Sequence, residues 1–363
     1  MRTWRHNRVA TRLLFVLAAA TATAVLAGSA SATRSAVGCT VRNLVSDGFV
    51  PAEHTDAHLV NGWGIAAGPS TPWWVADNGT DVSTLYDGTG IAVPLVVGVE
   101  GGPTGAVFNG GSEFVVNDGA GHSGPSLFMF ASENGTIHGW NPAVPPPPPS
   151  THAFVVVNRM NEGAVFKGLA IAGSRLYATD FHNGRVDVFD GTFHQIVSAG
   201  AFIDRGLPTG FAPFGIQNLG GTIFVTYAKQ GPDRMDEVHG PGLGYVDAYD
   251  QSGHLLGRVA SAGDLNAPWG LAWAPAGFGK FSGDLLVGNF GDGHIHAFKQ
   301  DTAGHFAAVG QLTDTSGRPI VIDGLWGIGF GNGNKSGPTT TLYFAAGPDD
   351  EAHGLFGRID PST

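Results

Sequence analysis

Acidic and amide side chains recur directly after short apolar runs along this chain of 363 residues. Carboxylate and amide oxygens are the ligands that Ca²⁺ and other hard divalent cations take in proteins. A bound cation would also offset clustered carboxylates, which otherwise repel one another and raise one another's pKa. The candidate metal ligands are Asp77, Asn117, Asp180, Asn289 and Glu351.

Two histidines at similar positions, His182 and His353, could act as general acid or base. Together with Asp180 they form the candidate catalytic set of a hydrolase or lyase in which the metal polarises a carbonyl group. A plainer interpretation stands beside it, because Asp and Asn next to Gly are ordinary turn formers. The sequence contains no H-E-x-x-H, G-x-S-x-G or P-loop motif.

A second group of residues stands just before apolar runs, close to a glycine. The candidate ligand-binding residues in this group are Asn61, Trp63, Lys167, Trp269 and Trp326. The three Trp-Gly pairs could stack a sugar or an aromatic ligand. They could equally pack neighbouring units together, with the glycine allowing a close backbone approach.

The elements that position these residues form an internal repeat. A polar or aromatic residue, then Gly, then an apolar run occurs six times, beginning at Trp63, Thr104, Lys167, Phe214, Trp269 and Trp326. A second strand-like run follows each phrase, at 72–77, 112–118, 174–180, 221–227, 283–289 and 340–346. Third runs include 185–190, 244–250, 294–299 and 353–359. Short apolar runs bounded by Gly, Asn and Asp are typical of strands joined by hairpin turns.

This pattern predicts an all-β fold, a six-bladed β-propeller that forms a single domain over residues 33–363. Fourth strands are expected within 92–99, 152–158, 254–260 and 306–312, and residues 39–46 are expected to close the ring. A β-sandwich or a parallel β-helix is the alternative, which the wide and uneven spacing disfavours.

Strand order within a blade indicates where chemistry could occur. The innermost strand starts at one face of the disc and the second strand returns to that face. Residues just before each first strand should therefore meet residues just after each second strand, around the central channel. The candidates for metal binding, catalysis and ligand binding all belong to these two groups, so this face is the predicted site.

Two segments are expected to lie outside the regular strands. Residues 141–150 contain five consecutive prolines and should form a stiff polyproline II spacer between units two and three. Residues 229–243, KQGPDRMDEVHGPGL, form a long polar loop inside unit four. Long loops on such scaffolds often carry function.

Composition restricts the classes of partner. The chain has 57 Gly, only 13% charged residues and a formal net charge of −11. A net acidic protein is a poor match for nucleic acid, which is bound through basic patches. The expected partner is a small molecule, a glycan or a protein, and a monomer is expected.

The first residues predict export. Residues 1–12 are basic, residues 13–28 are apolar and small, and Ala30-Ser31-Ala32 provides a cleavage site. Residues 1–32 are therefore a predicted signal peptide, and the mature chain is expected to be extracytoplasmic without a membrane span. Cys39 is the only cysteine, so no intrachain disulfide can form, and a buried, inert thiol is expected.

Several phrases carry a resemblance to a known family. They include NLVSDGFVPAEHTDAHLVNGWGIA, YAKQGPDRMDEVHGPGLGYVDAYD, LLVGNFGDGHIHAF and AAGPDDEAHGLFG. They resemble an uncharacterised family of secreted bacterial proteins with a propeller fold, some of which carry a C-terminal sorting anchor. A weaker likeness is to six-bladed propellers of the NHL and gluconolactonase types. Both resemblances imply the fold and no reaction or ligand.

Two functions follow as hypotheses. The first is a binding or scaffold protein that uses the channel face. The second is a metal-assisted hydrolase or lyase, with Ca²⁺ or another divalent ion at the channel mouth.

Overall fold

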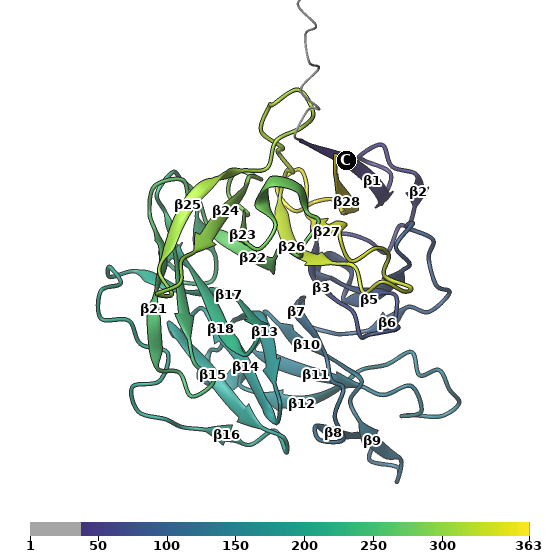
Figure 1. Ribbon diagram of the computed structural model, residues 1–363. Helices are drawn as coiled ribbons and strands as arrows, with labels where there is room; N and C mark the ends of the chain where they lie inside the picture. The colour runs from purple at the N-terminus through teal and green to yellow at the C-terminus, as the bar shows by residue number, and fades with distance from the viewer. Residues whose placement is uncertain (1–37, 363) are drawn as a thin grey trace, which may run out of the picture. The chain divides into compact units, whose positions relative to one another are not determined.

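The computed structural model describes residues 38–362, and these residues form six antiparallel blades around a central channel (Figure 1). The predicted signal peptide lies outside the described residues. Within residues 38–362 the six innermost strands contact one another in sequence, and the last of them contacts the first. The predicted propeller fold is confirmed.

The first three blades follow one another along the chain. Blade one contains β3 (Gly62–Ala66), β4 (Trp73–Asp77), β5 (Val82–Tyr86) and β6 (Val97–Gly98). Blade two contains β7 (Pro103–Phe108), β10 (Phe128–Ser132), β11 (Thr136–Trp140) and β12 (Phe154–Asn158). Blade three contains β13 (Phe166–Ala172), β14 (Arg175–Asp180), β15 (Arg185–Asp190) and β16 (Gln195–Ile196).

The other three blades complete the ring. Blade four contains β17 (Phe211–Leu219), β18 (Thr222–Gln230), β20 (Gly244–Tyr249) and β21 (Leu255–Ser261). Blade five contains β22 (Pro268–Trp273), β23 (Leu285–Asn289), β24 (Ile295–Gln300) and β25 (Phe306–Gln311). Blade six contains β26 (Leu325–Phe330), β27 (Leu342–Ala346), β28 (Leu355–Pro361) and β1 (Cys39–Ser46).

Short elements lie outside this pattern. They are β2 (His54–Thr55), β8 (Val115–Asn117), β9 (Ser123–Pro125), β19 (Glu237–Val238) and three 3₁₀ turns, η1 (Asn78–Thr80), η2 (Met160–Glu162) and η3 (Gly279–Phe281). None of the helical segments in the described part of the chain has the length and hydrophobicity that a membrane crossing requires.

The repeated glycine of each phrase is explained by packing around the channel. A Cβ atom on Gly64 would lie 2.5 Å from the Thr104 carbonyl oxygen of the next blade. A Cβ atom on Gly270 would lie 2.6 Å from the Trp326 carbonyl oxygen. Gly105, Gly168, Gly215 and Gly327 meet the backbone of the next blade in the same way. These six glycines therefore allow the innermost strands to approach closely enough to close the ring.

The ring is closed by both ends of the described chain, as the sequence predicts. Strand β1 pairs antiparallel with β28, from Cys39 opposite Pro361 to Ser46 opposite Leu355. Because β1 completes blade six, the ring has no open seam at this point.

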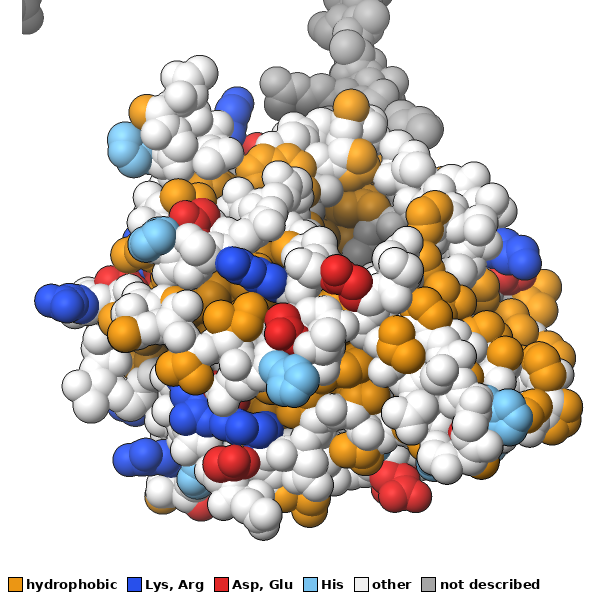
Figure 2. Space-filling model, turned by 90° about the horizontal axis from the view of Figure 1, so that it is seen from below, with side chains coloured by type: hydrophobic (Ala, Val, Ile, Leu, Met, Phe, Trp, Pro, Cys, Tyr) orange, Lys and Arg blue, Asp and Glu red, His pale blue; other side chains and the backbone are white. Residues whose placement is uncertain are grey.

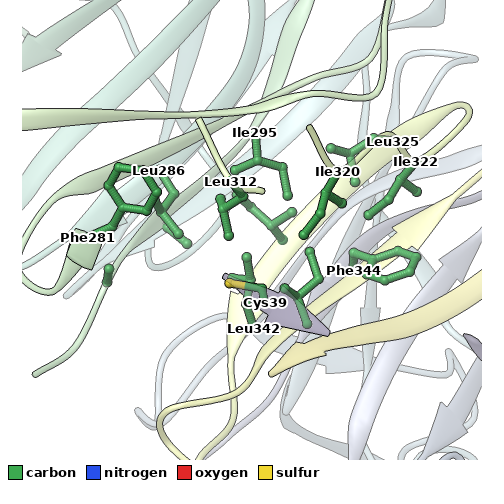
Figure 3. Close-up of a cluster of buried hydrophobic side chains, with 14 of the residues drawn as sticks. Cys39, Phe281, Leu286, Ile295, Leu312, Ile320, Ile322, Leu325, Leu342 and Phe344 are labelled. Atoms are coloured by element: carbon green, nitrogen blue, oxygen red, sulfur yellow. The ribbon is translucent and has the colours of Figure 1, made fainter. Parts of the chain in front are cut away.

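Hydrophobic side chains fill the spaces between blades. The cluster between blades five and six contains Leu286, Ile295, Leu342 and Phe344, and Cys39 on β1 points into it (Figure 3). Cys39 is buried, and burial is the main reason that the pKa of its thiol rises to about 11. The expected inert thiol is confirmed in its burial, because a thiol with this pKa stays protonated at neutral pH.

Two expectations about blade two are wrong. The run at 112–118 is not its second strand, because β8 and β9 form a separate two-stranded hairpin and β10 pairs with the innermost strand β7. The proline-rich segment 141–150 does not separate blades two and three. It connects β11 to β12 inside blade two, and β12 falls within the expected fourth strand 152–158.

Charged side chains are sparse on the face shown in Figure 2, which views the molecule from below. They lie scattered among hydrophobic and uncharged side chains, and no large basic patch forms on this face. This face therefore offers no broad electrostatic surface for a phosphate backbone.

Candidate functional site

A network of polar side chains gathers where the innermost strands begin, at one end of the channel. We call this network the channel mouth. It consists of Asn61, Asn78, Glu133, Lys167, Asp236, Glu237, His239 and Glu351. Its residues come from blades one, two, three, four and six, so only the closed ring brings them together.

Lys167 on β13 is the centre of the channel mouth. Its side chain is 2% exposed, and its Nζ donates to Glu133 Oε1 at 2.5 Å and to Asp236 Oδ1 at 3.1 Å. The same Nζ lies 5.0 Å from the centre of the Trp63 ring. Burial lowers the pKa of Lys167, but Glu133, Glu237 and Asp236 outweigh burial, so this pKa is raised overall. The ammonium group therefore stays protonated at neutral pH.

Glu351 and Asn61 form the second part of the channel mouth. Asn61 Nδ2 donates to Glu351 Oε2 at 2.6 Å, and Trp326 Nε1 donates to Asn61 Oδ1 at 3.0 Å. Burial raises the pKa of Glu351 to about 7, and Glu237 and Glu133 add to this rise, while Asn61 and Lys167 oppose it. Glu351 therefore exchanges a proton near neutral pH, which is a property of acid–base groups in sites.

The backbone is strained at both of these residues. Asn61 has φ +49° and Glu351 has φ +67°, and the two residues before Glu351, Asp349 and Asp350, also have positive φ. Three consecutive non-glycine residues in the left-handed region cost free energy, which the surrounding contacts must offset. Such strain occurs most often at functional sites.

The long loop of blade four covers one side of the channel mouth. Strand β19 pairs with the end of β18, Lys229 opposite Val238, and thereby folds residues 231–243 back over the blade. The loop places Asp236 on Lys167, and His239 Nε2 lies 3.2 Å from Glu237 Oε1. This hydrogen bond is the main cause of a raised pKa at His239, burial opposes it, and Glu351 and Asp350 raise it further.

Aromatic rings form the floor beneath these polar groups. Trp63 stacks on Trp326 at 3.6 Å between ring centres, and Phe290 stacks on the other side of Trp326 at 3.9 Å. Trp63 and Trp326 are fully buried, and Trp269 meets them edge to face. Trp269 Nε1 donates to the Lys167 carbonyl oxygen at 2.9 Å. The packing interpretation of the Trp-Gly pairs is therefore the correct one for Trp63 and Trp326.

The channel below this floor is nearly closed. The cavity there is about 20 Å³ and is lined by Trp269, Gly64 and Ile328 among others. That volume suits about one water molecule. A ligand would therefore sit on the polar groups above the tryptophans and not inside the channel.

The structure brings six of the sequence-predicted site residues together. They are Asn61, Trp63, Lys167, Trp269, Trp326 and Glu351, and they are linked by the contacts given above. The strand-order argument therefore located the channel mouth.

The proposed metal ligands do not form one cluster. Asn117 lies in the exposed β8–β9 hairpin, while Asp77, Asp180 and Asn289 are buried at the ends of second strands in three different blades. Asp77 accepts from the Thr84 backbone, Asp180 from Val165 and Asn183, and Asn289 donates to the Asp264 carbonyl oxygen. Among residues 38–362, no three His, Cys, Asp or Glu side chains are placed to hold a metal ion. Asp77, Asp180 and Asn289 thus bond within their own blades and not to a shared site.

The proposed catalytic set is not assembled either. Asp180 is fully buried and pairs with Arg185, and burial is the main cause of its raised pKa. His353 Nδ1 lies 2.6 Å from Asp47 Oδ2, and its ring stacks on Phe49 at 3.9 Å. The His182 carbonyl oxygen accepts from Gln230, and no hydrogen bond joins the His182 side chain to Asp180 or His353 among the described residues. The three side chains therefore lie in separate surroundings.

Sequence reasoning missed Glu133, Asp236, Glu237 and His239. Glu133 directly follows β10, so the strand-order rule selects it once β10 replaces 112–118 as the second strand of blade two. The other three belong to the loop 229–243, which the sequence singles out by length and polarity. Its conformation over Lys167 depends on contacts that no local pattern carries.

No family model matches the chain. Uncharacterized protein L690 of Acanthamoeba polyphaga mimivirus is 35% identical over 332 residues, which are 88% of this chain and 85% of that protein. Uncharacterized protein R648 of the same virus is 34% identical over 334 residues, covering 88% of this chain and 79% of that protein. These relatives are viral, so the bacterial and secreted character of the resembled family stays a prediction.

Solved structures share the fold at low identity. A soluble aldose sugar dehydrogenase from Escherichia coli superposes with a TM-score of 0.52 at 14% identity, over 89% of this chain and 99% of that one. A streptogramin B lyase gives 0.50 at 13% identity, over 89% and 97%. A Bacteroides thetaiotaomicron protein of unknown function gives 0.53 at 12%, over 90% and 74%. These likenesses show the fold alone, and the identity over most of its length shows that this propeller belongs to the same family as the mimivirus proteins L690 and R648.

Proposed function

We propose that this protein binds a small, neutral, hydroxyl-rich molecule such as a sugar or a sugar lactone at the channel mouth. One observation carries the proposal. Hydrogen-bond donors and acceptors from five blades converge around Lys167, whose ammonium group is buried. A closed ring is needed to assemble them, and packing alone does not require any of these groups to be charged.

The chemistry of the mouth favours a neutral ligand. Lys167, Asn61 and Asn78 donate hydrogen bonds, and Glu133 and Glu237 accept them. Sugar hydroxyl groups both donate and accept, so they suit a mixed set of this kind. Acidic groups outnumber the basic ones, which disfavours an anionic ligand. The ammonium group is already balanced by carboxylates and does not call for another anion.

The loop 231–243 supports entry of a ligand. Asp236 is 74% exposed, so its ion pair with the buried Lys167 is the outermost contact of the network. Exchanging this contact for a ligand hydroxyl group would uncover the ammonium group of Lys167 while β19 stays paired with β18.

Saturation-transfer NMR with the purified chain tests the proposal. The probes are D-glucose, D-galactose and myo-inositol, with D-gluconate as the charged counterpart. We expect saturable transfer from at least one neutral probe and weaker transfer to gluconate. Glu133→Gln, which removes the acceptor charge beside Lys167, should weaken binding by about tenfold.

Glu53→Gln is the matched control. Glu53 is also a carboxylate in an ion pair, 2.6 Å from Arg42, but it lies beside β1. Binding should be unchanged in this variant. Failure of every neutral probe to saturate, or gluconate binding as well as glucose, would contradict the proposal.

A second candidate function is acid–base catalysis, and the pKa of about 7 at Glu351 favours it. A carboxyl group that titrates near neutral pH can take and return a proton during lactone hydrolysis or elimination. The test is the hydrolysis rate of glucono-1,5-lactone at pH 7 with the protein and with Glu351→Gln. A protein-dependent rate that the variant loses supports catalysis, and a rate equal to that of buffer leaves binding alone.

A further inference from the structure

A cleft of about 480 Å³ opens at the rim between blades four and five, apart from the channel mouth. Strands β24 and β25 contribute His296 and Gln311 to it, and His294 directly precedes β24. The β23–β24 turn contributes Asp292, and the segment before β22 contributes Asp264. None of the side chains that line the cleft belongs to the channel mouth.

His296 gives the cleft an unsatisfied polar group. The residue is 8% exposed, and its Nε2 is buried without a hydrogen-bond partner among the described residues. Burial lowers the pKa of His296, Asp264 and Asp292 oppose this, and His294 adds to it, so the pKa falls overall. The ring is therefore neutral at pH 7. A buried nitrogen that lacks a partner costs free energy until a ligand or water supplies one.

The wall around His296 is held rigidly. Asp292 accepts from Asn289 Nδ2 at 3.1 Å and from Asn266 Nδ2 at 3.3 Å, and His294 Nδ1 lies 3.2 Å from it. Asn266 in turn accepts from the Gly240 backbone at 2.7 Å, which fixes the neighbouring loop. Asp292 is thus satisfied by the protein, and the cleft keeps its shape without a ligand.

Asp264 differs from Asp292 in having no partner. The Asp264 backbone accepts from Asn289, but none of the hydrogen bonds or ion pairs among residues 38–362 uses its carboxylate. The cleft contains no Lys or Arg to balance this charge. His294 Nδ1 is turned to Asp292, which leaves its Nε2 as the ring nitrogen available to a ligand. The free groups of the cleft are therefore mostly acceptors beside one uncompensated negative charge.

We propose that this cleft binds the primary ammonium group of a small organic amine, with Asp264 balancing its charge and the imidazoles of His294 and His296 hydrogen-bonding to the ligand. An ammonium group supplies three hydrogen-bond donors and one positive charge. It therefore complements the unpaired acceptors and the carboxylate of the cleft. This ligand class differs from the neutral one proposed for the channel mouth, and the two proposals stand on different residues.

Imidazole NMR provides the test. Long-range ¹H–¹⁵N spectra of ¹⁵N-histidine-labelled protein are recorded at pH 7.5 and constant ionic strength. The probes are ethanolamine and its neutral counterpart, ethylene glycol. His294→Gln and His296→Gln assign the two signals. We expect both to shift and saturate with ethanolamine and to stay in place with ethylene glycol.

Two variants that each remove one negative charge sharpen the test. Asp264→Asn should weaken ethanolamine binding by about tenfold or more. Glu100→Gln, at an exposed position in another blade, should leave it unchanged. Equal shifts with ethylene glycol, unsaturable shifts shared with His305 in its exposed turn, or full binding by Asp264→Asn would each overturn the proposal. The first of these outcomes would mean that the cleft takes water or neutral hydroxyl groups.

Discussion

Carboxylates at the two ends of the blades are held in opposite ways. At the channel mouth, Glu133, Glu237 and Glu351 come from different blades and surround one buried cation. Burial raises the pKa of Glu351, and the backbone that carries it is strained. These charges owe their position to contacts between residues far apart in the chain.

The turns between third and fourth strands show the other arrangement. Their aspartates accept from the backbone two and four residues later, as Asp250 does from Ser252 at 2.8 Å and His254 at 3.0 Å. In these turns the aspartates are Asp87, Asp190, Asp250 and Asp301. Local hydrogen bonds are the principal cause of the lowered pKa at Asp190, Asp250 and Asp301.

The difference separates charges that serve folding from charges that serve a site. A turn aspartate is stabilised by hydrogen bonds within its own loop and does not depend on contacts with distant residues. The carboxylates of the channel mouth stay close to one another at a cost that their neighbours must offset. Repulsion between these carboxylates destabilises the fold, and no local turn requires them. This is a reason to infer a functional site at the channel mouth.

Lys167→Met tests the channel mouth most severely. The substitution removes the only ammonium group from the network and leaves Glu133 and the nearly buried Glu237 without their shared cation. Loss of one partner from a buried charge pair costs about 4 kcal/mol of unfolding free energy. Urea unfolding at pH 7 measures it. Lys299→Met, at an exposed position on β24, should change stability by less than about 0.5 kcal/mol.

Gly270→Ala tests whether the network depends on close blade packing. The new methyl group would meet the Trp326 carbonyl oxygen at 2.6 Å, and backbone cannot move aside as a flexible side chain can. We expect a loss of about 3 kcal/mol in urea unfolding. Gly257→Ala on β21 is the matched control, because nothing lies within 4 Å of its Cβ position. If both variants unfold at the wild-type midpoint, the ring does not require its glycines.

Glu351→Gln separates the two regions by the sign of their pH dependence. A carboxyl group with its pKa raised from 4.5 to about 7 binds more protons in the folded state, so folding loses stability as pH rises through this window. The variant cannot ionise there. Its stability relative to wild type should increase by about 3 kcal/mol between pH 4.5 and pH 7.5. A constant difference across this range would show that Glu351 titrates normally.

Asp250→Ala should show the opposite sign and the smallest effect. Its folded pKa is lowered, so the unfolded state binds more protons in acid and the stabilisation by Asp250 is lost as pH falls below about 4. At pH 7 the variant should lose about 1 kcal/mol with its turn hydrogen bonds. The deficit should shrink between pH 4 and pH 2. An equal deficit at both ends would assign the effect to the backbone and not to the charge.

Most of the fold could be read from local pattern. The six glycine phrases begin within three residues of the innermost strands, because tight packing at the channel demands glycine at one position of every blade. Blade two was the exception. The run at 112–118 has a strand composition, yet tertiary pairing selects β10 for the ladder with β7.

The site could be predicted only where it depends on strand order. Asn61, Lys167 and Glu351 follow from the position of blade strands, and so does Glu133 once β10 is placed. The predicted metal and catalytic sets failed because a position after a second strand does not show which way a side chain turns. Asp180 turns to its own loop, while Glu351 turns to Asn61. Asp236 and His239 required the fold of a long loop, which long-range contacts decide.

The pairing of β1 with β28 has a consequence for how the chain folds. Strand β1 is made first, and its partner is among the last segments to appear. Until then, one edge of β1 lacks its neighbour and could pair with another chain. Contacts between such distant segments form slowly, because closing the long loop between them costs entropy before the contacts contribute any stabilisation. Joining the two ends of the described chain and opening it instead between β2 and β3 would make these strands neighbours in sequence, and this permuted chain should fold faster to the same ring.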